Sequence, residues 1–388
     1  MYVIIQRYEI YKKQMEEKMK DKMGNIFDYI LWRDIPIEKV EFNEIDSLIL
    51  TRFSYFPLDG LINDGEKITI KECYERYKKQ VHKGEILIKA DLDLFPLMAS
   101  SKRFGNLYVK NYINKLDAKQ EKQFSAVTII LPENIEYVAY RGTDDTIVGW
   151  KEDFNMSFST LVPAQQDAVE YLNSLGNKGK IIVGGHSKGG NLAVYAAVFC
   201  NKKVQKRIIK VHNFDGPGFA KEVIDREEYN EVLTRIHNYI PQSSIIGRLL
   251  EHKGQVTIIK STQTGIMQHD LYSWQLLADK FITSELTYSS EFIDRSLTQW
   301  LQTVNVEQRK EFIDILFEIL NKTEVERFAD LNTRKFAAAK TIITSYKKLD
   351  AESKKAMTYA LSMFWEAGKS NLFTKKTIKN AKKEQLEC

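Results

Sequence analysis

A serine lies between two glycines at the point where an apolar run gives way to an alanine-rich segment. Residues 180 to 197 read KIIVGGHSKGGNLAVYAA. β-Branched residues followed by glycines and then alanines predict a strand that turns abruptly into a helix, with Ser187 at the bend. Gly185 and Gly189 suit a backbone that is bent too tightly for a Cβ atom. A hydroxyl held there could attack a carbonyl, because the N–H groups of a helix N-terminus favour a developing oxyanion. A plain glycine turn is the alternative.

A serine hydroxyl is a poor nucleophile at neutral pH unless a histidine takes its proton. Of the six histidines, His269 fits this role best, because it lies in the polar segment GIMQHDLYSW after a strand predicted at residues 255–260. A surface histidine is the alternative. The other five histidines are expected to be structural: His186 is expected to point away from the serine, His212 and His237 lie in predicted strands, and His82 and His252 lie in helical segments.

A carboxylate must orient the histidine, and Asp215 ends a strand predicted at residues 208–214. The C-terminal end of a parallel strand is where such a group should stand. The alternative is that Asp215 only caps the Gly-Pro-Gly turn behind it.

Two backbone N–H groups must hold the oxyanion. We expect one at Lys188, directly after Ser187. The other is expected at Thr143, in the sequence RGTDD that follows an earlier predicted strand. For this second segment, a simple strand-ending turn is the alternative.

The elements around these residues alternate between strand and helix. Apolar runs predict a hairpin of strands at 124–131 and 135–140, then strands at 180–184, 208–214, 233–240 and 255–260 with helices between them. This alternation indicates an α/β protein with a mostly parallel central sheet and helices on both faces. Three regions follow: a charged helical extension over residues 1–22, an α/β domain over 23–288 that is helical to about residue 122, and a basic helical region over 289–388.

The composition of the 388 residues is typical of a soluble globular protein, with 43% hydrophobic residues. The cysteines Cys73, Cys200 and Cys388 are far apart, so they indicate neither a disulfide framework nor a zinc site. No apolar run reaches the roughly 20 residues of a membrane span, and no signal peptide is recognisable, which favours the cytoplasm.

The charge of the chain is concentrated near its end. Residues 334–388 carry 13 Lys or Arg against five Asp or Glu. These basic helices could contact an anionic membrane surface, but a solvated lysine face is the favoured interpretation. No nucleic-acid partner is expected.

Taken together, these motifs resemble a known family. The strand end YRGT at 140–143, a Trp-x-x-Asp loop at Trp150 and Asp153, and the Gly-His-Ser-x-Gly-Gly elbow form the pattern of class 3 lipases. Further similarity, to the Mbeg-like family of bacterial α/β hydrolases, comes from Lys188 and from the segments MGNIFDY (23–29), DGPG (215–218), PQSSIIG (241–247) and QHD (268–270). The resemblance covers residues 23 to at least 300. It implies an α/β-hydrolase fold and a triad of Ser187, Asp215 and His269.

The chain departs from class 3 lipases at the triad acid. Those enzymes carry the acid just after the strand that precedes the histidine loop, in an Asp-x-Val-Pro context, whereas residues 238–250 here contain no carboxylate. Either the acid has moved one strand earlier, to Asp215, or the triad is incomplete and the domain does not catalyse.

We therefore expect a serine hydrolase of the lipase or esterase type that cleaves a carboxylic ester and needs no cofactor. Ser187 would attack the carbonyl, His269 would carry the proton, Asp215 would orient His269, and the N–H groups of Thr143 and Lys188 would hold the oxyanion. Apolar residues between 147 and 161 could form a lid, which favours an acyl-chain or lipid substrate, although core packing explains them equally well. The alternative is a non-catalytic hydrolase-fold protein that binds a partner or a membrane surface.

Overall fold

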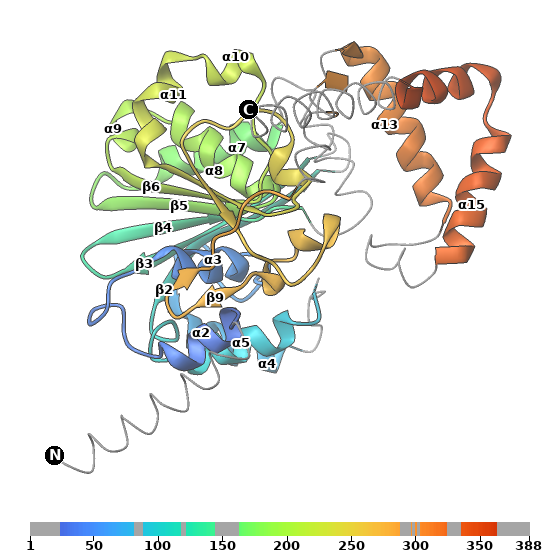
Figure 1. The fold of residues 1–388 in the computed structure, drawn as a ribbon. Helices are drawn as coiled ribbons and strands as arrows, with labels where there is room; N and C mark the ends of the chain where they lie inside the picture. Colours follow the sequence, from blue (N-terminus) through green and yellow to red (C-terminus); the bar gives the residue numbers. More distant parts are fainter. Residues whose placement is uncertain are drawn as a thin grey trace, which may run out of the picture.

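An eight-stranded β-sheet forms the centre of the computed structural model, and its strands lie side by side in chain order (Figure 1). The structure describes residues 24–80, 88–117, 122–143 and 163–287, and in the C-terminal region residues 296, 299–300, 303–323 and 335–362. The strands are β1 (Lys67–Thr69), β2 (Tyr108–Asp117), β3 (Lys122–Leu131), β4 (Ile135–Tyr140), β5 (Lys180–His186), β6 (Ile208–Phe214), β7 (Ile236–Pro241) and β8 (Gln255–Ile259).

The first half of the sheet, from β1 to β4, is antiparallel. β3 and β4 form the predicted hairpin, whereas β1 and β2 correct the expectation that the chain is helical up to about residue 122. The pairing of β2 with β3 shifts between Lys110 and Ile113, and Asn111 within this bulge has a φ of 53°. A bulge breaks the two-residue alternation by which a strand is recognised in a sequence, so β2 left no clear pattern.

The second half of the sheet, from β4 to β8, is parallel, as the alternation of strands and helices predicted. The connections contain α7 (Pro163–Ser174), α8 (Lys188–Phe199), α9 (Lys202–Gln205), α10 (Lys221–Ile224), α11 (Glu227–Val232), η1 (Leu233–Arg235) and η2 (Ile246–Arg248). Parallel strands end at the same edge of a sheet. Residues 141, 187 and 215, which directly follow β4, β5 and β6, are therefore brought to one edge.

Helices cover both faces of the sheet (Figure 1). One face packs against the N-terminal helices α2 (Ile26–Trp32), α3 (Glu44–Phe53), α4 (Ile70–Lys79) and α5 (Asp91–Ser100), and the other against α7, α8 and α11. Successive strand residues alternate between the two cores, since Ala139 and Ile182 belong to the first and Val138 and Ile181 to the second. The layered arrangement is an α/β-hydrolase fold.

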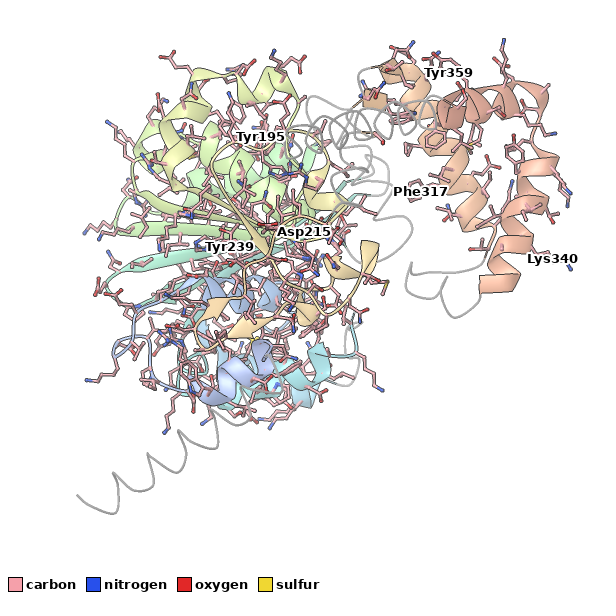
Figure 2. The ribbon with its side chains drawn as sticks, in the orientation of Figure 1. Tyr195, Asp215, Tyr239, Phe317, Lys340 and Tyr359 are labelled. Carbon is pink, nitrogen blue, oxygen red and sulfur yellow. The ribbon has the colours of Figure 1, made fainter. Side chains whose placement is uncertain are left out.

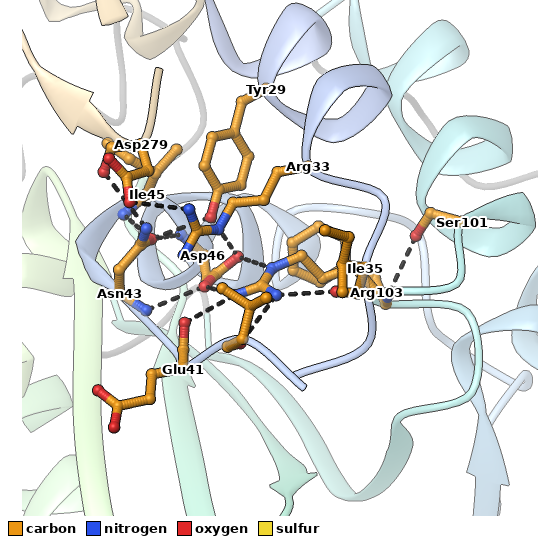
Figure 3. Close-up of polar contacts among 12 residues, drawn as sticks. Tyr29, Arg33, Ile35, Glu41, Asn43, Ile45, Asp46, Ser101, Arg103 and Asp279 are labelled. Carbon is orange, nitrogen blue, oxygen red and sulfur yellow. Dashed lines mark hydrogen bonds and ion pairs between the residues drawn. The ribbon is translucent and has the colours of Figure 1, made fainter. Parts of the chain in front are cut away.

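A buried ion pair fixes the N-terminal helical layer (Figure 3). The Arg103 guanidinium donates to the Asp46 carboxylate through Nε at 2.6 Å, and both side chains are fully buried. Its other nitrogens donate to the backbone carbonyls of Ile35, Val40 and Glu41, while the Tyr29 hydroxyl donates to Asp46 at 2.9 Å. Because every charged group here has partners, the cost of burying the pair is offset.

The chain after β8 returns to this helical layer. It passes through the short helices η3 (Gly265–His269) and η4 (Leu271–Ser273) and a small hairpin of β9 (Leu276–Leu277) and β10 (Lys280–Phe281). The Leu276 N–H donates to the Gly24 carbonyl at 2.8 Å. The segment that carries His269 is thus bracketed by the sheet and the N-terminal helices.

In the C-terminal region, α13 (Val306–Asn321) contacts α15 (Lys335–Lys348), and the Trp300 indole donates to the Ala360 carbonyl at 2.8 Å. Among the residues that the structure describes, no helix combines the length and the apolar character that crossing a membrane requires. The predicted extension at residues 1–22 lies outside the described residues.

Candidate active site

Ser187 occupies a strained bend between β5 and α8. It follows the last residue of β5, precedes the first residue of α8, and has φ and ψ of 58° and −133°. A Cβ at Gly185 would overlap the backbone of Gly189, so only glycine permits so close an approach. The Ser187 N–H donates to the Phe214 carbonyl at 3.0 Å, which ties the bend to the end of β6. Non-glycine residues in this region of φ and ψ persist where the surrounding structure enforces them, and they concentrate at functional sites.

Asp215 lies directly after β6, in the middle of the α/β domain (Figure 2). It has a φ of 51°, and its N–H donates to the Tyr239 carbonyl at 2.9 Å. One carboxylate oxygen accepts the Ser244 hydroxyl at 2.5 Å, and that hydroxyl accepts the Gly247 N–H at 3.0 Å. Residues 238–250, where class 3 lipases carry the triad acid, contain no carboxylate but contribute Ser244, which orients Asp215.

The other carboxylate oxygen of Asp215 lies 2.8 Å from Nδ1 of His269. A carboxylate accepts hydrogen bonds, so Nδ1 carries a hydrogen, and in the neutral form of the ring the lone pair lies on Nε2. Burial raises the pKa of Asp215, whereas the neighbouring His269 and Ser244 oppose that increase. The Asp215 side chain is 1% exposed and the His269 side chain is 14% exposed, so the imidazole is the more accessible member of the pair.

His186, which the sequence indicates only as a structural residue pointing away from the serine, lies against His269. The two ring centroids are 4.5 Å apart, and Nε2 of His186 donates to the His269 carbonyl at 2.8 Å. Burial holds the pKa of His186 well below its usual value, and the nearby His269 and Arg52 lower it further. His186 is therefore neutral at pH 7 and fixes the backbone of the His269 segment.

The two expected oxyanion donors belong to the segment after β4 and to the start of α8. Thr143 is buried two residues after Arg141 at the end of β4, and Lys188 is the first residue of α8, where backbone N–H groups point away from the helix. A Cβ on Gly142 would lie 3.1 Å from Cβ of Ser187, so the β4 end and the serine are in contact. The Gly142 N–H donates to the Tyr55 hydroxyl at 2.9 Å.

The remaining histidines lie elsewhere. His212 and His237 are in β6 and β7, as predicted, and Nδ1 of His212 is 2.6 Å from the Ser47 hydroxyl. His252 lies in the irregular segment before β8, not in a helix as expected, because the helical stretch there ends at Arg248. His82 lies outside the described residues.

The expected lid at residues 147–161, with the motif residues Trp150 and Asp153, also lies outside the described residues. Within the described ranges, no group of three or more His, Cys, Asp or Glu side chains could hold a metal ion. Tyr55, His186 and Ser244 are the site residues that sequence reasoning missed. His186 and Ser244 had a signal, since they belong to the motifs Gly-His-Ser-x-Gly-Gly and PQSSIIG, whereas no motif marks Tyr55.

Comparison with known proteins places the chain in a family. No curated protein matches it. Among solved structures, it is similar to the crystal structure of M37 lipase, with 16% sequence identity and a TM-score of 0.36 over 54% of this chain and 71% of that chain. The Mbeg1-like family model matches residues 98–318, which is more than half of the chain and includes both the serine bend and the His269 segment. The chain belongs to the Mbeg1-like family.

Proposed function

We propose that this protein is a serine hydrolase of the lipase or esterase type that cleaves a carboxylic ester. The observation that carries the proposal is the 2.8 Å contact between His269 and Asp215, at the edge of the sheet where Ser187 follows the neighbouring strand β5. Where a buried carboxylate orients an imidazole and that imidazole can reach a serine hydroxyl, the hydroxyl becomes a nucleophile. The hydrolase fold agrees with this chemistry but does not by itself imply it.

In the proposed reaction, Nε2 of His269 takes the hydroxyl proton as Ser187 Oγ attacks the ester carbonyl. The carbonyl oxygen becomes an oxyanion, which the N–H groups of Thr143 and Lys188 stabilise. When the C–O bond to the alcohol breaks, His269 returns the proton to the leaving oxygen. Water then attacks the acylated serine with the same proton transfers and releases the carboxylic acid.

The charges around His269 support this role. The imidazole becomes positive in each proton transfer, and the Asp215 carboxylate at 2.8 Å stabilises that charge. The ring of His186 stands 4.5 Å away but remains neutral, because burial lowers its pKa. A second positive imidazole would oppose protonation of His269, so a neutral neighbour preserves the basicity that the reaction needs.

A panel of p-nitrophenyl esters of increasing acyl length tests the proposal. We expect hydrolysis by the wild-type protein and its loss in Ser187→Ala, with the best chain length defining the acyl substrate. The matched control is Ser174→Ala, which removes a hydroxyl that donates to the Tyr171 carbonyl in α7. Equal activity of wild-type and Ser187→Ala proteins would contradict the proposal. No hydrolysis of any ester would instead favour a binding protein with a hydrolase fold.

A further inference from the structure

Tyr55 joins two parts of the candidate site that are remote in the sequence. It lies two residues after α3 in the N-terminal helical layer and is 4% exposed. Its hydroxyl accepts the Gly142 N–H at 2.9 Å and donates to the His186 carbonyl at 3.0 Å. One phenol therefore bridges the end of β4, which leads to Thr143, and the end of β5, which leads to Ser187.

The close packing around this phenol explains why residue 142 is glycine. A Cβ there would overlap the Tyr55 hydroxyl and the His186 carbonyl oxygen, and would stand 3.1 Å from Cβ of Ser187. Tyr55 accepts the Gly142 N–H, and Gly142 directly precedes Thr143, whose N–H the proposed function assigns to the oxyanion. The bond at Gly142 thus restrains the peptide that precedes Thr143.

Tyr55 is itself held by a buried ion pair. The Arg52 guanidinium lies 4.4 Å from the centre of the Tyr55 ring, and its Nε donates to Asp91 at 2.7 Å. Arg52 and Asp91 are 2% and 1% exposed. Asp91 also accepts the Tyr272 hydroxyl at 2.5 Å, and Tyr272 lies three residues after His269. The same network therefore extends from the β4 end to the His269 segment.

We infer that Tyr55 is a positioning residue for ester hydrolysis, whose hydroxyl sets the Thr143 segment against Ser187 so that the oxyanion donors match the transition state. This inference rests on the proposed function. A donor that is displaced by a fraction of an ångström stabilises the oxyanion less but leaves the ground-state ester almost unaffected, because the charge develops only in the transition state.

The test is the kinetics of Tyr55→Phe with a p-nitrophenyl ester. We expect kcat to fall by about 10- to 100-fold, less than the loss of a donor itself, with KM changed by less than about twofold. Affinity for an aryl boronic acid, which forms a tetrahedral adduct on a serine, should fall by a similar factor. The matched control is Tyr171→Phe. That phenol is equally buried and also bridges two groups, the Thr128 hydroxyl at 2.7 Å and the Asn111 carbonyl at 2.8 Å, but in the core around α7.

A general loss of packing would lower the thermal midpoint of both variants and leave kcat of the folded proteins alone. Wild-type kcat in Tyr55→Phe, or an equal fall in Tyr171→Phe, would overturn the inference while leaving the proposed function intact. A wild-type protein that hydrolyses no ester would overturn both.

Should Tyr55→Phe not fold, p-methylphenylalanine and p-aminophenylalanine at position 55 provide the same test. Both fill the space of tyrosine, but only the amino group can bond to Gly142 and His186. Retained kcat with the amino group and lost kcat with the methyl group support the inference, and equal values overturn it.

Discussion

The N-terminal helical layer and the edge where the parallel strands end both contain buried aspartates, but their partners differ. In the layer, Asp46 faces Arg103 and Asp91 faces Arg52. At the edge, Asp215 faces His269. A guanidinium stays charged at any ordinary pH, so the first two pairs are permanent, whereas an imidazole can gain and lose a proton. A buried aspartate thus stabilises the structure when its partner is an arginine, and can support proton transfer when its partner is a histidine.

The sharpest test of this difference is Asp215→Asn. We expect kcat for a p-nitrophenyl ester to fall by about 10⁴-fold, because a neutral amide does not stabilise a positive imidazole and its NH2 group can donate to Nδ1, which favours the wrong tautomer. The fold should persist, since asparagine tolerates the φ of 51° at this position and removes a buried charge. The urea midpoint checks this. Asp225→Asn, in an exposed pair with Lys253, is the control and should keep its kcat. Near-wild-type turnover by Asp215→Asn would show that the acid lies elsewhere.

Arg103→Met should show the opposite profile. Leaving Asp46 buried without its guanidinium should lower the free energy of unfolding by about 3–5 kcal/mol, measured by urea denaturation. The kcat of the protein that remains folded should not change, because the Arg103 guanidinium bonds to Asp46 and to backbone carbonyls of the helical layer. Lys202→Met, in an exposed pair with Glu231, should shift the urea midpoint little. A comparable loss of stability in Arg103→Met and Lys202→Met would contradict the claim that the buried ion pair contributes more to stability than the exposed one.

Arg52→Lys tests whether the Arg52–Asp91 pair supports the candidate active site as well as the N-terminal helical layer. Lysine keeps the charge near Asp91 but loses the planar fork that lies over Tyr55. We expect kcat to fall about 10-fold with little change in KM, an effect smaller than that of Tyr55→Phe. The equivalent change Arg103→Lys should lower the thermal midpoint without altering kcat. If the two lysine variants behave alike, the Arg52 pair has no connection with the site.

Buried histidines that lack a carboxylate partner predict an acid-sensitive fold. Burial holds the pKa of His212 well below its usual value, with His237 and Lys210 lowering it further. Below about pH 6.5, His212 becomes protonated in the unfolded chain but stays neutral in the folded chain. The free energy of unfolding therefore decreases as the pH decreases, by up to ~1.4 kcal/mol per pH unit.

His212→Asn should reduce the slope of unfolding free energy between pH 6 and pH 5 by about one proton, measured by urea denaturation at each pH. His237, which is only partly buried in the neighbouring strand, offers His237→Asn as the comparison, and its effect should be smaller. An unchanged slope in His212→Asn would mean that residue 212 is protonated in the folded protein.

Local signals explain which parts of the fold could be predicted. The bend at Ser187 was predictable because glycines, β-branched residues and alanines stand next to one another in the chain. The hairpin of β3 and β4 and the strands β5 to β8 carried similar local patterns. β2 was not recognised, because the bulge around Asn111 breaks its alternation and half of its residues are Lys, Asn or Asp.

The contacts of Tyr55 could not be predicted, for a different reason. It lies 87 residues before Gly142 and 131 before His186, and no motif marks it. Its role depends on how α3 packs on the sheet, which is a property of the folded chain. The meeting of Asp215 and His269 was expected from the position of each at a strand end or loop. The bond from Ser244 to Asp215 depends on how the chain after β7 folds back over β6, which no local pattern indicates.

Labelling with a fluorophosphonate, followed by peptide mass spectrometry, tests the central claim most directly. If Ser187 is an activated nucleophile, the probe should modify the peptide that contains residue 187 in the wild-type protein, at a rate that falls sharply in Asp215→Asn, and should modify nothing in Ser187→Ala. Absence of labelling in the folded wild-type protein, or labelling of a different serine, would contradict the account.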